Sequence, residues 1–185
     1  EICMFEDNLH KHEGPLYSYG GYIKDRKIRE NSTSGGAFTA ICRAFCSGYD
    51  SYAVFGSASD KLRIYHTYVN RVDDIFIFNS SKYGQSVMGD SFRHAKLFLK
   101  EKKRVVFSGT PCQIAALYKF LGKEEFPGLL TIEVLCTGIP SSLFVEKYDE
   151  WCFHKYNSHI RVFNYRYTNH NRWDDQSTLV ELDNG

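Results

Sequence analysis

The sequence predicts an α/β or α+β fold with a mixed, partly parallel sheet and flanking helices. The main observation is a pair of successive units of one design, an apolar strand, a cysteine-containing turn and a helix, at 104–122 and 129–151. Two runs rich in β-branched and aromatic residues, 52–59 and 63–70, are typical of strands. Successive strand–helix units normally give parallel strands with right-handed crossovers. We therefore expect both cysteine-containing turns at one carboxyl edge of the sheet, where open α/β sheets bind ligands.

The remaining elements follow from local patterns. Residues 1–30 are mixed and polar, although 17–25 alternates weakly enough to suggest an edge strand. Apolar residues then recur at helical spacing in 38–47. Four residues interrupt regular structure in the first segment, and a fifth ends the helix: Gly14, Pro15, Gly20, Gly21 and Gly48. The later segments predict a short turn of helix or strand followed by a loop at 72–86, an amphipathic helix at 91–103, a strand within the basic–aromatic tail 159–175, and a strand-like run at 177–185.

Composition limits the possible functions. The chain has 185 residues, enough for about one domain. Its 23 basic and 22 acidic residues nearly cancel, so no global field favours nucleic acid or an anionic membrane. No apolar run reaches the roughly 18–20 residues of a membrane span, and no signal-peptide pattern opens the sequence. Because the chain begins with Glu1 and stops in a strand-like run, we expect a single domain at 1–185 that is a piece of a longer protein.

Cysteine usage favours a reducing, cytoplasmic setting. Six cysteines are spread along the chain without a CxxC pair or the density of a disulfide framework, at positions 3, 42, 46, 112, 136 and 152. Such cysteines are typically buried hydrophobes, metal ligands or reactive thiols. Cys42 and Cys46 share one helix face, where they could chelate a metal, although the apolar pattern favours a core stripe. Cys3 and Cys152 have no diagnostic surroundings, so either core or surface fits them.

Cys112 lies where a strand passes directly into a helix, behind Pro111. Proline suits the first helical turn, and the unpaired N–H groups and dipole there favour a thiolate. Such a thiolate can be a nucleophile or a metal ligand, whereas the plain alternative is a small residue packed in a tight turn. Cys136 follows the next strand, and alone it fits core and site equally. Together, two soft ligands at one edge would suit an iron–sulfur or zinc site.

Two polar loops are further candidate sites. The stretch "NSTSGGAF" leads into a helix with hydroxyls and glycines, which could form an anion cradle or simply an N-cap. The stretch "SSKYGQS" offers groups that could neutralise phosphate, stack on a ring or hydrogen-bond to a heterocycle, or could form an ordinary exposed loop. Near the end, basic and aromatic residues alternate, at Arg161, Phe163, Tyr165, Arg166, Tyr167, Arg172 and Trp173. Such alternation can bind nucleic acid, but the neutral overall charge favours a strand with one basic face. The histidines show no metalloprotease or hydrolase order.

Four motifs in this order, "RENSTSGGAF", "SSKYGQS", "VVFSGTPCQIAAL" and "LLTIEVLCTGIPSS", resemble the coenzyme F-420 hydrogenase/dehydrogenase beta-subunit family. Bacterial relatives of that family occur in polysaccharide gene neighbourhoods. The resemblance runs from about 17 to 150 and weakens through "FNYRYTNHNRW". It implies a flavoprotein that binds FAD and a 4Fe–4S cluster. Such proteins pass electrons between the cluster, the flavin and a hydride partner such as F-420.

Carried over motif by motif, the resemblance makes Cys112 and Cys136 cluster ligands. The residues that it implies at the flavin, or at a small-molecule redox substrate, are Ser32, Thr33, Ser34, Gly35, Gly36, Lys82, Tyr83, Gln85, Ser86, Thr110 and Gln113. The remaining cluster ligands could be Cys42, Cys46, a carboxylate or a residue outside this chain. Thr137 stands where the family usually has histidine, which weakens a proton-transfer or cluster-tuning role there.

The CxxCxxC segment of many relatives is absent from this sequence, so we expect an electron-donor protein or ferredoxin-like module as partner. Two other functions stay open. One is a cysteine-nucleophile enzyme without redox cofactor that uses Cys112. The other is a non-catalytic scaffold in polysaccharide metabolism. Iron and flavin content would separate the redox hypothesis from both alternatives.

Overall fold

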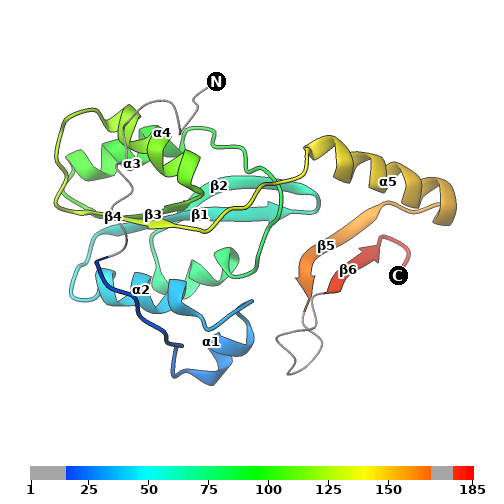
Figure 1. Ribbon diagram of the computed structural model, residues 1–185, viewed down its shortest axis with the longest axis horizontal. Helices are drawn as coiled ribbons and strands as arrows, with labels where there is room; N and C mark the ends of the chain where they lie inside the picture. The colour runs from blue at the N-terminus through cyan, green and yellow to red at the C-terminus, as the bar shows by residue number, and fades with distance from the viewer. Residues whose placement is uncertain (1–15, 168–176) are drawn as a thin grey trace.

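The computed structural model describes residues 16–167 and 177–185, and Figure 1 shows their arrangement around one central sheet. Gly14 and Pro15 lie outside the described residues, as do Cys3, Arg172 and Trp173, so the expectations for them stay predictions. None of the described helices is long and apolar enough to cross a membrane.

The central sheet has the strand order β2-β1-β3-β4. Its strands are β1 (Tyr52–Asp60), β2 (Arg63–Val69), β3 (Arg104–Gly109) and β4 (Leu129–Glu133). β1 pairs with β2 antiparallel, whereas β1 with β3 and β3 with β4 are parallel pairs. The predicted mixed, partly parallel sheet is therefore confirmed, and the strands of the two cysteine units are direct neighbours.

Helices cover both faces of this sheet (Figure 1). On one face, α3 (Ser91–Lys100) and α4 (Pro111–Leu121) pack against Phe55 and Phe107. On the other, α2 (Ala37–Cys46) and the 3-10 helix η1 (Val72–Phe78) pack against Val54 and Val106. Successive strand residues point to opposite faces, so both β1 and β3 need apolar side chains at consecutive positions. This double burial explains why their sequences are nearly continuous apolar runs.

One predicted strand is wrong. Residues 17–25 form no strand, and the chain continues into a short helix, α1 (Arg26–Glu30), whose N-cap Asp25 accepts a hydrogen bond from the N–H of Ile28. The segment before α1 is held to the rest of the fold by the Ile23 N–H, which donates to the Gly35 carbonyl over 2.8 Å. The alternation in 17–25 is weak and two glycines interrupt it, so this segment does not pair with another strand.

The second cysteine unit also departs from expectation after its strand. Figure 1 shows α5 (Ser142–Tyr156) away from the sheet, beside the hairpin of β5 (Ile160–Tyr167) and β6 (Ser177–Leu182). Only Val145 and Cys152 of α5 are buried, whereas Phe144 and Trp151 are among its exposed large side chains. Its apolar residues are spread around the helix rather than along one stripe, so it lacks the face that a crossover helix lays on a sheet.

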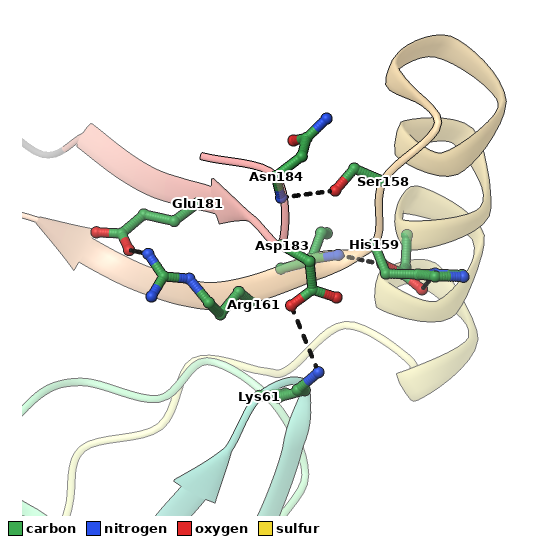
Figure 2. Close-up of polar contacts among 9 residues, drawn as sticks. Lys61, Ser158, His159, Arg161, Glu181, Asp183 and Asn184 are labelled. Atoms are coloured by element: carbon green, nitrogen blue, oxygen red, sulfur yellow. Dashed lines mark hydrogen bonds and ion pairs between the residues drawn. The ribbon is translucent and has the colours of Figure 1, made fainter.

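Polar contacts join α5 to the hairpin (Figure 2). Asp149 of α5 accepts from the Ile160 N–H at 2.7 Å and lies 2.8 Å from Nδ1 of His159. The Ser158 hydroxyl accepts from the Asn184 N–H, at the other end of the hairpin. Lys61, in the turn between β1 and β2, lies 3.7 Å from Asp183 and links this unit to the central sheet.

Asp149 carries the junction between α5 and β5. Burial acts to raise the pKa of its carboxyl, but the Ile160 N–H and the His159 ring together hold that pKa below its ordinary value. We expect Asp149→Ala to lower the free energy of unfolding by about 1–3 kcal/mol at pH 7, because a charged acceptor is lost from a backbone N–H.

The loss should be complete above about pH 4 and should shrink at lower pH, where the unfolded carboxyl gains its proton before the folded one. Urea denaturation at pH 7 and pH 3 measures it. Lys147→Ala, which removes an exposed pair with Glu150, is the control and should change stability by less than about 0.5 kcal/mol. Equal effects of the two variants would contradict the assignment.

Candidate functional site

The two cysteine-containing turns lie at the same sheet edge. In the β3–β4 register Gly109 is the partner of Glu133, and the Val134 N–H donates to the Gly109 carbonyl over 2.8 Å. Cys112 lies three residues after Gly109, and Cys136 lies three residues after Glu133. Cys112 is exposed and Cys136 half-buried, so both thiols are open to a ligand at this edge.

The Cys112 turn, residues 109–113, is held by its own polar groups. Thr110 is the N-cap of α4, and Pro111 lies in its first turn, as the sequence predicts for the proline. The Thr110 N–H donates to Oε1 of Gln113 at 3.0 Å, and Oγ1 of Thr110 lies 3.1 Å from Sγ of Cys112. A Cβ on Gly109 would come within 3.1 Å of the Gln113 side chain, so glycine leaves the room that lets Gln113 fold back.

Gln113 joins this turn to the 80–86 loop. Its Oε1 faces the Thr110 N–H, so its Nε2 is the group that donates to the Ser86 hydroxyl, at 2.9 Å. Ser86 is buried. Three residues that the resemblance selected separately, Ser86, Thr110 and Gln113, therefore form one connected group.

His66 is a member of this group that sequence reasoning missed. Its Nδ1 lies 2.8 Å from the Ser86 hydroxyl, and its Nε2 lies 2.9 Å from the Ser108 carbonyl. Burial lowers the pKa of His66, although the hydrogen bond to Ser108 acts in the opposite direction. The available signal was strand periodicity, because Ile64 and His66 occupy the buried face of β2 two residues apart.

Lys82 is the cation of the 80–86 loop. Its Nζ donates to the carbonyl and hydroxyl of Ser80, at 3.3 and 3.2 Å. Within the described part of the chain it takes part in no salt bridge. Burial lowers the pKa of its ammonium to about 8. Lys82 is thus half-buried and positively charged at neutral pH, and its partners among the described residues are neutral, a combination that favours an anionic ligand.

The 32–36 loop lies beside the 80–86 loop. The Thr33 hydroxyl accepts from the Ser81 N–H at 2.9 Å, and the Thr39 hydroxyl of α2 bonds to the Asn79 side chain at 3.0 Å. Ser32 instead donates to the Ile28 carbonyl at the end of α1. The structure therefore brings together the two loops that the sequence offered as separate sites.

The N-cap of α2 is Gly36, and no side chain caps the helix. A simple Ser/Thr cap, one of the two interpretations of this loop, is therefore wrong. Both glycines also have a structural reason. Gly36 has a φ of +72°, and an added Cβ would lie 2.7 Å from Ile23, while at Gly35 it would lie 3.0 Å from the Gly21 carbonyl. Contact of this loop with phosphate stays a prediction.

A cleft of about 380 Å³ lies between the end of the 80–86 loop, β2 and the start of α5. Gly84, Gln85 and Tyr165 of β5 are among the residues that line it. The Tyr165 ring meets Tyr83 edge-on, at 6.3 Å between ring centroids, and burial raises the pKa of its hydroxyl. The cleft is at the small end of ligand pockets and suits one ring system rather than a whole dinucleotide.

The other described cysteines are not at this edge. Cys42 and Cys46 lie in the core with Val54 and Val106, as the apolar pattern predicted, and burial raises the pKa of Cys42 to about 12. Cys152 is buried as well. Among the described residues no group of three or more His, Cys, Asp or Glu side chains could hold a metal ion. The described side chains alone therefore do not complete a four-ligand cluster site.

A comparison with protein families matches residues 102–185 to the family model for the C terminus of the beta subunit of coenzyme F420 hydrogenase/dehydrogenase. The matched residues make up just under half of the chain. The resemblance drawn from the motifs is confirmed, but its extent differs, because this match includes the tail where the motifs weaken. The match contains the Cys112 turn and Cys136, whereas the 32–36 and 80–86 loops lie before it.

Among solved structures, the chain is similar to one from the F420-reducing [NiFe] hydrogenase complex of Methanosarcina barkeri, with a TM-score of 0.55 and 19% sequence identity. The alignment covers 90% of this chain and 59% of that one. At this identity the likeness shows a shared fold. No curated protein matches the chain significantly.

Gly36 offers a test of how the 32–36 loop is built. We expect Gly36→Ala to destabilise the protein by more than about 1–2 kcal/mol, because left-handed backbone strain adds to the contact with Ile23. Gly48→Ala shares the positive φ without a close contact, so it should show the strain alone, and Gly20→Ala should change little. Urea denaturation measures the free energy of unfolding of the three variants. A Gly36→Ala variant as stable as the wild-type protein would contradict the prediction.

Proposed function

We propose that this chain is an oxidoreductase domain of the F-420 hydrogenase beta-subunit type, relaying electrons between a 4Fe–4S cluster and FAD or a deazaflavin-type hydride partner. The observation that carries the proposal is the position of the two thiols. Within the family match, Cys112 and Cys136 follow neighbouring parallel strands by the same number of residues. Soft thiolate ligands at the carboxyl edge of a sheet suit iron–sulfur chemistry.

The two polar loops would hold the flavin. Lys82 supplies a positive charge without a carboxylate partner among the described residues, and the uncapped N-terminus of α2 supplies N–H groups beside it. Both favour the pyrophosphate of a dinucleotide. The neighbouring cleft, with Gln85 and Tyr165 in its wall, would accept a ring. When bound, the flavin supplies the exchange between single electrons and hydride equivalents.

The thiols would supply two ligands of the cluster. A 4Fe–4S cluster is held by four protein ligands, typically cysteines, and the described residues place only Cys112 and Cys136 here. Because Cys42, Cys46 and Cys152 are buried elsewhere, the other ligands would come from outside the described residues, such as a partner module. The proposal therefore includes a protein partner that delivers electrons at this edge.

The cysteine-nucleophile hypothesis keeps one favourable observation, which is that Cys112 is exposed in the first turn of α4. A nucleophile is normally activated by an adjacent base. Among the described residues, the hydrogen-bond partner of its sulfur is the Thr110 hydroxyl rather than a histidine or carboxylate. The redox proposal therefore fits the geometry better, and metal analysis separates the two.

The first test is metal and flavin content after anaerobic purification. We expect a brown protein with bound iron, sulfide and flavin, and we expect Cys112→Ser and Cys136→Ser each to lose most of the iron and the visible absorbance. Thr137→Ala, beside Cys136, is the control and should keep both. A colourless, metal-free anaerobic preparation would overturn the proposal, and a single fast-alkylating thiol in it would support the nucleophile hypothesis.

The second test concerns Lys82. Because its pKa is about 8, FAD affinity should fall as the pH rises above about 8 and the ammonium loses its proton. Lys82→Gln should bind FAD about tenfold more weakly at pH 7, as expected for loss of a charge-assisted contact. Lys82→Arg should stay charged and remove the pH dependence. Fluorescence titration measures these affinities, with the exposed Lys119→Gln as control, and a pH-independent wild-type affinity would exclude the role.

A further inference from the structure

The hydrogen bonds around His66 have only one consistent direction. A carbonyl oxygen can only accept, so Nε2 of His66 carries the proton that is donated to Ser108 over 2.9 Å. In a neutral ring Nδ1 is then an acceptor, and the Ser86 hydroxyl donates to it over 2.8 Å. The Ser86 oxygen in turn accepts from Nε2 of Gln113. Gln113 is left with Oε1 for the Thr110 N–H, which fixes its amide orientation as well.

We propose that His66 is a positioning residue for the Cys112 turn, acting through Ser86 and Gln113 on the backbone of Thr110. The contacts that carry this inference are all within hydrogen-bonding distance and link β2, the 80–86 loop and α4. The inference deepens the proposed function, because the turn that is positioned carries a candidate cluster ligand.

Histidine suits this position because it must both donate and accept within a buried site. β1 and β3 pair last at Phe55 and Phe107, so the Ser108 carbonyl lies one residue beyond that register, where the His66 ring supplies a donor. The ring also stacks on Phe107, with 5.6 Å between centroids and 16° between planes. An apolar residue could fill the same space, but it would leave the Ser108 carbonyl and the Ser86 hydroxyl without these partners.

Protonation of the His66 ring should therefore change the hydrogen bonds that hold the Cys112 turn. A second ring proton on Nδ1 would force the Ser86 oxygen to accept from both His66 and Gln113 and to turn its own proton elsewhere. The titratable groups of the elements packed here include Lys82 in the loop, His94 on α3 and Cys112 on α4. Among the described residues, the His66 ring contacts Ser86, Ser108 and Phe107. None of the three titratable groups forms a hydrogen bond or ion pair with the ring in the described part of the chain.

Two substitutions separate positioning from simple packing. An asparagine places its carbonyl oxygen near the position of Nδ1, whereas a glutamine reaches the position of Nε2. His66→Asn should therefore keep an acceptor for Ser86, and His66→Gln should lose it while keeping a donor to Ser108. A packing role predicts the opposite order, because asparagine is smaller and leaves the larger cavity against Phe107. Ser86→Ala removes the link itself and leaves the ring in place.

The readout is amide hydrogen exchange of Thr110 by NMR on the purified protein without added ligand, with the Val105 amide of β3 as reference for overall stability. We expect His66→Gln and Ser86→Ala to raise Thr110 exchange about fivefold relative to Val105, as loss of one hydrogen bond would do. His66→Asn should raise it less than about twofold. In the wild-type protein the Thr110 and Gln113 amide signals should move together with the His66 ring as it titrates below pH 6.5.

An unchanged Thr110 in Ser86→Ala, or a larger effect of His66→Asn than of His66→Gln, would overturn the inference. So would a His66 titration that leaves the Gln113 amide unmoved. None of these measurements depends on iron or flavin. A failure of the proposed redox function would therefore appear in metal analysis and leave this result standing, and the reverse also holds.

Discussion

The parallel pairing of β3 with β4 is the constraint on which the rest of the site depends. The register that pairs Gly109 with Glu133 brings two turns, 24 residues apart along the chain, to one edge of the sheet, where they start from paired positions of adjacent strands. Double burial of β3 makes that register hard to shift, because a slip by one residue would exchange the side chains packed on α3 and α4 with those packed on α2. The position of the thiols is thus set by the core rather than by the turns.

The need of buried polar groups for hydrogen-bond partners then determines how the loops are arranged around that edge. Pairing between β1 and β3 stops before Ser108, and buried polar groups beyond that point need partners from elsewhere. His66, Ser86 and Gln113 provide them in sequence, and this chain of bonds ties the 80–86 loop to the start of α4. Thr33 extends the connection to the 32–36 loop. The hydrogen bonds that the fold requires have therefore brought together polar groups that the proposed function assigns to the flavin site.

The site divides into two chemical halves. Around Lys82 the groups are hard donors, an ammonium and backbone N–H groups, and they suit an anion. At Cys112 and Cys136 the groups are soft sulfur atoms. Gln113 lies between the halves, because it contacts both the 80–86 loop and the turn that carries Cys112. Under the proposed function, the first half would hold the flavin and the second would supply ligands to the cluster.

The sequence by itself determined the sheet, most helices and the core role of Cys42, because apolar periodicity is a local property that burial enforces residue by residue. It also indicated that the two cysteine turns share an edge, since parallel units impose that geometry. Only the tertiary structure placed α5 beside the hairpin and brought His66 to Ser86 and Ser108. Those outcomes depend on which long-range partner satisfies each polar group or apolar face, and a single sequence pattern does not specify that partner.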